Sequence, residues 1–313
     1  MKENLLIITG PTAVGKTNSS IKLAKDLNGE IISADSMQIY KYMDIGTAKI
    51  QREEMQGIKH HLVDIIYPDE DFTVSDYKNK ATSIISNINR DTRLPIVVGG
   101  TGLYINSLVY KLNFATVPPN EVLREKYENL ANEYGNKYIH EQLSKVDKES
   151  GKKIHVRDRR RIIRALEVYH TSGITMSQYS KDFRQESDEY NLAMICLNMN
   201  RAKLYDKINS RVDQMMDKGL IQEVKDILEM GYNKDLVSLQ GIGYKEIIMY
   251  LDGYISLNEA VEKIKQGSRN YAKRQLTWFR RDKRIQFIDI DDFTDSNELV
   301  THIKTYINNH MYL

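Results

Sequence analysis

The sequence predicts an α/β protein, with a parallel β-sheet flanked by helices and a helical insertion between two of its strands. A glycine-rich loop at residues 10–17 joins an apolar run of strand length to a run with helical spacing. Further short apolar runs end at Asp35 and at Gly99, as buried parallel strands do where a ligand crevice begins. Residues 121–187 contain repeated helical patterns and no convincing strand. Together these observations favour a sheet-based core interrupted by a helical segment.

The loop GPTAVGKT matches the phosphate-binding pattern G-x-x-x-x-G-K-[ST]. The run NLLIIT at 4–9 predicts the strand before it, and residues 17–27 predict the helix after it. Backbone N–H groups of such a loop and the positive end of the helix dipole face an anion. Lys16 adds a mobile cation, and the Thr17 hydroxyl is placed to ligate Mg²⁺. We therefore expect a P-loop NTPase-like core whose polyphosphate ligand is held by Gly10, Pro11, Thr12, Ala13, Val14, Gly15, Lys16 and Thr17.

The second predicted strand, residues 30–34, ends at Asp35. Because the carboxyl ends of parallel strands face the ligand crevice, Asp35 is expected close to the phosphate loop. From the residues alone, three roles are open for this carboxylate. It could cap a helix, orient Mg²⁺, or act as a general base.

The next elements repeat the strand–helix order. We expect a strand at 61–65, a helix over 73–89 and a strand at 94–98 that ends in the turn Gly99-Gly100-Thr101-Gly102. This second glycine-rich turn is again directed at the crevice. Thr101 either caps the following helix or contributes its hydroxyl to the site.

The insertion is expected to contain helices over 122–134, 137–143 and 159–170. Seven of the fourteen residues from Gly151 to Arg164 are Lys or Arg, and one is acidic. Such a run is commonly a solvated helix face, but its lack of counter-charges indicates a polyanionic partner.

After the insertion we expect a strand at 191–198, helices through 201–230, and a closing strand and helix at 285–290 and 298–308. The stretch LQGIGYKE at 239–246 either allows close backbone approach to a ligand or simply begins a helix.

A second basic segment runs from Ser268 to Arg284, with seven Lys or Arg against one Asp. It also contains Tyr271, Trp278 and Phe279. Cations interleaved with aromatic rings suit single-stranded nucleic acid, whereas an amphipathic helix with buried aromatics would leave the charge bias unexplained.

The composition is that of an ordinary globular protein, with 41% hydrophobic and 28% charged residues among 313. No apolar run is long enough to cross a membrane, and the sequence enters its first strand without room for a signal peptide. Cys196 is the single cysteine, which excludes an internal disulfide. A cytoplasmic, monomeric protein is expected.

Six segments, in this order, closely resemble the bacterial tRNA dimethylallyltransferases, also called tRNA isopentenyltransferases. They are GPTAVGKT, ADSMQIYKYMDIGTAK, GGTGLYINSL, RRRIIRALEVYHTSG, LQGIGYKE and KRQLTWFRRD. The resemblance covers nearly the whole chain. The block from Asp-Ser-Met-Gln to Asp-Ile-Gly-Thr-Ala-Lys is far more specific than the phosphate loop.

The resemblance implies that the loop grips the diphosphate of dimethylallyl diphosphate. N6 of the adenosine 3′-adjacent to the anticodon would attack the allylic C1, and inorganic diphosphate would leave. Mg²⁺ on Thr17, with Arg124 and Arg211, would stabilise the leaving group. Asp35 would be the general base, and Thr101 would hydrogen-bond near the bridging oxygen.

The resemblance also implies a division into a catalytic core, 1–117 plus 190–313, and a tRNA-clamping insertion, 118–189. The adenine would be flipped out of the anticodon loop to reach Asp35. The tRNA anticodon stem-loop would be held by Asp35, Ser36, Met37, Gln38, Arg159, Arg160, Arg161, Arg164, Gln240, Gly241, Gly243, Tyr244, Lys245, Lys273, Arg274, Gln275, Trp278 and Arg280.

Three other functions are compatible with some of the same motifs. An isopentenyltransferase acting on free AMP, ADP or ATP would share the loop and Asp35 but would not need two basic segments. A nucleotide kinase would share the loop. An RNA-binding switch that senses ATP would need no base at Asp35.

Overall fold

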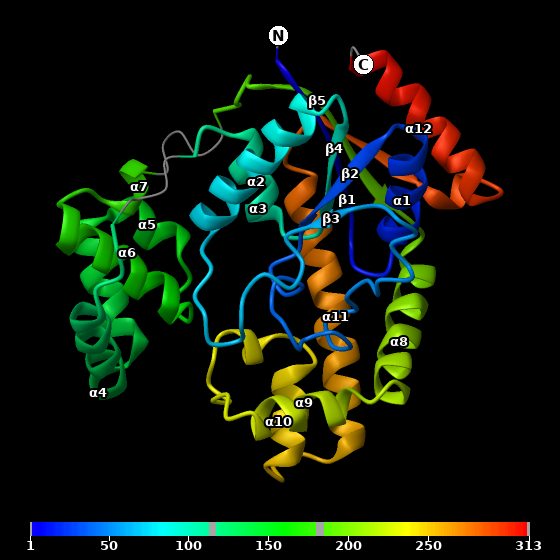
Figure 1. The fold of residues 1–313 in the computed structure, drawn as a ribbon. Helices are drawn as coiled ribbons and strands as arrows, with labels where there is room; N and C mark the ends of the chain where they lie inside the picture. Colours follow the sequence, from blue (N-terminus) through cyan, green and yellow to red (C-terminus); the bar gives the residue numbers. More distant parts are fainter. Residues whose placement is uncertain (1, 113–116, 180–184, 312–313) are drawn as a thin grey trace. The chain divides into compact units, whose positions relative to one another are not determined.

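The computed structural model describes residues 2–112, 117–179 and 185–311 (Figure 1). The chain divides into two compact units. The first unit holds the sheet, and the second is formed by the middle of the chain. Their bounds are Met1–Val109 with Asp188–Leu313, and Tyr110–Ser187.

The first unit is built on a six-stranded sheet in the order β3-β2-β4-β1-β5-β6. Every pair of neighbouring strands is parallel. The predicted α/β class with a parallel sheet is therefore confirmed. The strands are β1 (Glu3–Thr9), β2 (Gly29–Ala34), β3 (His60–His61), β4 (Leu94–Gly99), β5 (Tyr190–Asn198) and β6 (Ile285–Asp289).

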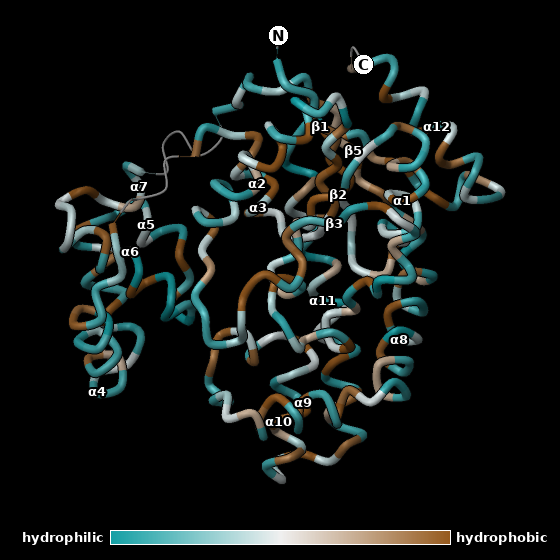
Figure 2. The backbone as a smooth tube through the Cα atoms, in the orientation of Figure 1, coloured by the Kyte–Doolittle hydropathy of each residue, from teal (hydrophilic) through white to brown (hydrophobic). Residues whose placement is uncertain are grey.

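Strands β1 and β5 come from opposite sides of the second unit in the sequence, yet they pair along their whole length. Glu3 lies opposite Tyr190, and Thr9 lies opposite Cys196. Leu5 to Ile8 of β1 are fully buried, which explains the continuous apolar run of a central parallel strand. Figure 2 shows hydrophobic residues concentrated along β1, β2 and β5.

Helices cover both faces of the sheet. Figure 1 shows α2 and α3 on one side and α1 and α12 on the other. The first pair packs together, as does the second. The bounds are α1 (Lys16–Asp26), α2 (Val74–Arg90), α3 (Gly102–Val109) and α12 (Ser296–His310).

The strand expected at 61–65 is wrong, because β3 ends after His61. Leu62 and Asp64 have φ values of 60° and 55°, in the left-handed region that an extended strand does not enter. The segment instead bonds to the residues after β2. Asp64 N donates to Gln38 O, and Ile65 N donates to Ile39 O.

A helical layer lies at the carboxyl ends of the strands. Its apolar cluster includes Ile39, Tyr40 and Met43, so the segment after β2 is packed on these helices. Gly219, with φ of 97°, separates the two helices expected between 201 and 230. The layer contains α8 (Arg201–Asp217), α9 (Leu220–Glu229), η1 (Ser238–Gln240), α10 (Tyr244–Leu251) and α11 (Leu257–Phe279).

The second unit is helical in its described residues, apart from one isolated bridge between Tyr110 and Glu186. The element α4 contains the two helices predicted at 122–134 and 137–143, which meet at a kink where Gly135 has non-helical angles (φ 83°, ψ 163°). In the second unit, α4 and α6 pack together around a separate cluster of buried apolar residues. The helices are α4 (Glu121–Val146), α5 (Lys148–Lys153), α6 (Arg159–Ser172) and α7 (Met176–Tyr179). No helix among the described residues of either unit is long and apolar enough to cross a membrane.

Candidate active site

The phosphate loop connects β1 to α1, as predicted. Gly10 and Gly15 have φ values of 145° and 99°, which side-chain-bearing residues rarely adopt. A Cβ on Gly10 would also lie 2.5 Å from Leu197 O of the neighbouring strand. The loop backbone is therefore specified by its glycines, and α1 begins at Lys16 with its N-terminus toward the loop.

Lys16 is partly buried, and its Nζ donates to Gly10 O (3.0 Å) and Pro11 O (2.9 Å). Burial lowers the pKa of this ammonium to about 8, although the Asp35 carboxylate raises it again in part and the Arg211 charge lowers it further. The three charged groups are thus electrostatically coupled around the loop. The Thr17 side chain, one residue on, is exposed.

A cavity of about 400 Å³ brings together residues from several of the segments that the sequence singled out in the first unit, but none from the turn at 99–102. It is lined by Thr12 of the phosphate loop, by Arg211 of α8 and by Arg274 of α11. Residues from two further predicted segments also line it, among them Asp35, Ser36, Met37, Gln240, Gly241, Tyr244 and Lys245. A second cavity of about 1000 Å³ includes Thr17 and shares Arg211 with the first. Burial lowers the pKa of Arg211.

Asp35 follows β2 and does not cap a helix, because a turn follows it. Its Oδ1 accepts a hydrogen bond from Met37 N (2.9 Å), which fixes the carboxylate beside its own backbone. The side chain is only partly exposed and lines the smaller cavity. A carboxylate held in this way can accept a proton from a group bound there.

Thr101 binds the segment after β2 and does not use its hydroxyl to cap α3. Its Oγ1 accepts from Ser36 N (3.0 Å) and lies 3.3 Å from Ser36 Oγ. Its backbone N–H donates to Ala34 O (3.0 Å). Thr101 therefore ties the ends of β2 and β4 together at the edge of the cavity.

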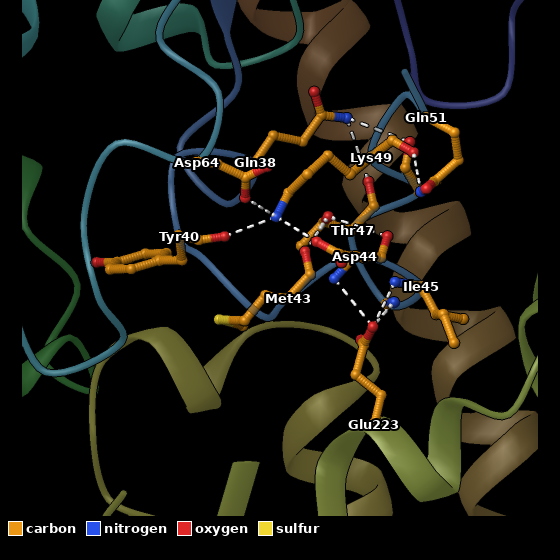
Figure 3. A network of polar contacts seen from close by, with 12 residues as sticks. Gln38, Tyr40, Met43, Asp44, Ile45, Thr47, Lys49, Gln51, Asp64 and Glu223 are labelled. Atoms are coloured by element: carbon orange, nitrogen blue, oxygen red, sulfur yellow. Dashed lines mark hydrogen bonds and ion pairs between the residues drawn. The ribbon is translucent and has the colours of Figure 1, made fainter. Parts of the chain in front are cut away.

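Two charged residues that the sequence did not reveal organise the segment after Asp35 (Figure 3). Glu223 of α9 accepts hydrogen bonds from the backbone N–H groups of residues 44–46 at 2.6–3.0 Å and from the Tyr244 hydroxyl at 2.6 Å. Buried Lys49 donates to Tyr40 O (2.7 Å) and forms ion pairs with two aspartates, Asp44 and Asp64.

Gln38 belongs to the same network. Its amide nitrogen donates to Thr47 O (3.3 Å) and Ala48 O (3.4 Å), as Figure 3 shows. The side chain expected to hold a flipped base is therefore also used to brace the Asp-Ile-Gly-Thr-Ala-Lys segment. Glu223 had no recognisable signal, since an isolated Glu in an amphipathic helix is usually solvated.

Comparison with known proteins decides the family. Residues 38–282 match the family described as IPP transferase. The chain belongs to this family. It is 51% identical to the tRNA dimethylallyltransferase of Thermoanaerobacter sp. (strain X514) and 52% identical to that of Caldanaerobacter subterraneus subsp. tengcongensis. Each match covers 98% of this chain and 98% of the relative.

Solved structures of IPP transferases have the same fold. The full-length tRNA isopentenylpyrophosphate transferase of Bacillus halodurans is 46% identical, with a TM-score of 0.74, over 99% of this chain and 97% of that one. A eukaryotic dimethylallyltransferase described as acting on tRNA is 28% identical, with a TM-score of 0.82, over 98% and 80% of the two chains. The resemblance found in the sequence is confirmed.

The glycine turn of this IPP transferase packs against the residues after Asp35. A Cβ on Gly241 would lie 2.6 Å from Met37 Cε. Gly243 has a φ of 101° and precedes α10, where Tyr244 is fully buried. Gln240 and Lys245 are exposed at the ends of the turn. The turn thus combines a close backbone approach with a helix start.

The RNA-binding residues predicted on and just after α11 lie on two faces, one exposed to solvent and one packed against the rest of the first unit. Lys273, Arg274 and Arg280 are exposed. Gln275 is buried, and its amide bonds to the phosphate loop and to the turn after β4. The Trp278 indole lies against Gly102 and its Nε1 donates to Asn106 Oδ1 at 3.4 Å.

In the second unit, the predicted arginines also differ in their contacts. Arg160 and Arg161 are exposed on α6. Arg159 is held on α4, with its Nε donating to Asn136 Oδ1 (2.7 Å) and its Nη1 to Asn132 Oδ1 (2.7 Å).

Arg124 and Arg164 both bind Glu167, which is fully buried. Arg124 Nε lies 2.9 Å from one carboxylate oxygen, and Arg164 Nη1 lies 2.6 Å from the other. Burial raises the pKa of Glu167, but a hydrogen bond from Asn120 N and the Arg164 contact outweigh it and hold the pKa below its usual value. Glu167 is therefore a charged centre of the second unit.

Proposed function

We propose that this IPP transferase is a tRNA dimethylallyltransferase that alkylates N6 of the adenosine 3′-adjacent to the anticodon, using dimethylallyl diphosphate. The observation that carries the proposal is one cavity lined by the phosphate loop, Asp35 and Arg211. It supports a reaction in which a diphosphate leaves while a nearby carboxylate takes a proton.

The phosphate loop and two cations stabilise the leaving group. Loop N–H groups and the N-terminus of α1 face the diphosphate, and Lys16 exchanges its bonds to Gly10 and Pro11 carbonyls for phosphate oxygens. Arg211 lines both cavities and adds a second positive charge. Charge that develops as the allylic C–O bond breaks is then neutralised by groups already in place.

Asp35 removes the proton from the amine. N6 attacks C1 of the dimethylallyl group, the C1–O bond breaks, and inorganic diphosphate leaves with the bonding electrons. The N6 proton passes to the Asp35 carboxylate, whose position is fixed by Met37 N. The Thr101 hydroxyl, held at Ser36, lies beside the same cavity wall.

The residues present fit Mg²⁺ bound mainly by the substrate. Among the described residues, no group of three or more His, Cys, Asp or Glu side chains could hold a metal ion. The exposed Thr17 hydroxyl offers one hard oxygen donor at the start of α1, and diphosphate oxygens would supply others. Bound there, Mg²⁺ would neutralise part of the diphosphate charge.

The anticodon stem-loop is held by exposed cations. Arg160 and Arg161 in the second unit, Lys273 and Arg274 on α11 and Arg280 just after it are exposed to RNA phosphates. Arg161 also pairs with Asp158 within its own helix turn, at 3.5 Å. The adenine reaches Asp35 by leaving the loop stack, and Met37 and the Gly241 turn bound the space that receives it.

Mass spectrometry of nucleosides tests this proposal. Unmodified tRNA incubated with the protein, Mg²⁺ and dimethylallyl diphosphate should yield N6-isopentenyladenosine at the position after the anticodon. The same reaction with free AMP, ADP or ATP should give no prenylated nucleotide. Prenylation of free nucleotides but not tRNA would instead support the alternative transferase.

A further inference from the structure

We infer that Gln275 of α11 is a positioning residue that fixes the phosphate loop and the turn after β4 relative to each other, and that it does not contact tRNA. This inference rests on the proposed function, because the loop it fixes is the one that binds the diphosphate. It replaces the role that the resemblance implied for Gln275.

The Gln275 amide is placed between two strand ends. Its Oε1 accepts a hydrogen bond from Thr12 N (2.9 Å), and its Nε2 donates to Gly100 O (3.1 Å). The residue is only 5% exposed, so both ends of the amide are used inside the protein. A side chain with one donor and one acceptor is required to satisfy both partners, and glutamine alone has this reach and polarity.

The absence of a side chain at Gly100 allows this close contact. A Cβ on Gly100 would lie 2.0 Å from Gln275 Nε2. A side chain at position 100 would therefore displace the glutamine amide from its place beside the backbone after β4. This contact connects α11 to the turn after β4.

The same face of α11 extends this connection to Asp35. Tyr271, one helical turn before Gln275, lines the same cavity as Asp35. Thr101 directly follows Gly100, whose carbonyl Gln275 holds. Thr101 in turn accepts from Ser36 N. Three hydrogen bonds and the peptide bond between Gly100 and Thr101 thus link Thr12, the β4 turn and the residue after Asp35, and Gln275 of α11 makes two of these hydrogen bonds.

The test uses two variants and a matched control in the full-length protein. Gln275→Met keeps the shape but removes both hydrogen bonds. Gln275→Glu keeps an acceptor for Thr12 N but cannot donate to Gly100 O. Gln266→Met makes the same substitution at an exposed position of the same helix.

Hydrogen–deuterium exchange is the first readout. In Gln275→Met, amides of residues 10–17 and 99–102 should exchange faster than in the wild type. In Gln275→Glu, the increase should be confined to 99–102. Gln266→Met should match the wild type in both segments. Unchanged exchange in all three proteins would overturn the inference.

Calorimetry with Mg²⁺ and inorganic diphosphate is the second readout, with tRNA affinity measured in parallel. Gln275→Met should bind diphosphate roughly 10-fold more weakly, as expected for the loss of two hydrogen bonds that hold the loop, and should bind tRNA within about twofold of the wild type. A loss of tRNA affinity with normal diphosphate binding would show a direct RNA contact and overturn the inference.

The two proposals fail in different ways. If the wild type binds no diphosphate, the proposed function fails, and the exchange data alone decide whether Gln275 fixes the two segments. If Gln275→Met does not fold, Gln275→Glu becomes the test of the inference, because this variant is expected to lose exchange protection only at residues 99–102. Normal exchange there would contradict the role of the amide nitrogen.

Discussion

Lys16 and Asp35 follow β1 and β2, and their charges interact beside the phosphate loop. Both positions were predicted from the sequence, because a strand that ends in a charged or glycine-rich turn places that turn at the crevice. Their partners were not predictable. Met37 N fixes Asp35, and loop carbonyls hold Lys16.

Asp35→Asn should lower kcat by on the order of 10²- to 10⁴-fold, or about 3–5 kcal/mol in the barrier, with little change in the affinity for either substrate. Asparagine keeps the shape and the bond from Met37 N, but it cannot accept the proton. Single-turnover rates measured across a Mg²⁺ titration check this. Recovery at high Mg²⁺ would show that Asp35 acts through the metal.

The affinity for diphosphate should fall as the pH rises through about 8. Lys16 has a pKa of about 8 in the free protein, so the charged form that attracts the anion is present below this pH and is lost above it. Calorimetric titrations of inorganic diphosphate between about pH 6.5 and 9.5 measure the effect.

Lys16→Arg provides the control for this pH dependence, because arginine stays charged throughout the range. The difference between the two curves of affinity against pH gives the effect of Lys16 ionisation, because the ionisation of diphosphate affects both proteins equally. Parallel curves for the two proteins would contradict the lowered pKa.

At the scale of elements, α6 and α11 each carry two kinds of polar side chain. Some are cations that face solvent, and others are arginines or amides that form hydrogen bonds within the protein. On α6, Arg160 and Arg161 are exposed, whereas Arg159 and Arg164 bind acceptors within the second unit. Neutralising the first pair should therefore change RNA binding, and neutralising the second should also disturb packing.

Arg160→Ala with Arg161→Ala should flatten the salt dependence of tRNA binding. Each lost phosphate contact should reduce the log–log slope by roughly 0.7–0.9, so the pair should reduce it by about 1.4–1.8. Lys80→Ala with Arg90→Ala removes the same charge from the exposed surface of α2 and should leave the slope unchanged. An identical slope in both double variants would indicate that α6 is only a solvated face.

The periodicity of apolar residues predicted α1, α2, α4, α6, α8, α9, α12 and most strands. It predicted neither the full extent of α11 nor which of its faces meets the sheet. Tyr271 and Gln275 lie one turn apart, and only the position of the β4 turn decides that they point inward. The expected strand at 61–65 failed for a similar reason. Left-handed φ values at Leu62 and Asp64 depend on bonds to residues after β2, which periodicity does not report.

At the scale of the whole molecule, the first unit is assembled from two separate stretches of chain. Strands β1 and β5, one from each stretch, pair along their whole length. The second unit has its own buried cluster and a buried charged centre at Glu167. Its ends are close together, since Tyr110 pairs with Glu186 and Lys111 N donates to Gln185 O (2.8 Å).

Replacing residues 112–184 by a short Gly-Ser linker should therefore leave a folded first unit. The variant should unfold cooperatively in a thermal melt followed by circular dichroism. It should still bind inorganic diphosphate through the phosphate loop and Arg211, and any loss of diphosphate affinity measures the contribution of Arg124. Its tRNA affinity should fall by roughly tenfold or more, because the cations of the second unit are lost.

Loss of cooperative unfolding in this variant would show that the sheet needs the second unit to fold. Retention of full tRNA affinity would show that α11 and the glycine turn supply the RNA contacts by themselves.

The contact of Trp278 with Gly102 makes the intrinsic fluorescence of the protein sensitive to the turn after β4. The chain has a single tryptophan, so emission excited at the red edge of the absorption band comes from one indole. That indole touches the turn which carries Thr101, and its N–H reaches Asn106 on the helix that follows. The emission spectrum of Trp278 therefore reports on the turn after β4 without any attached dye.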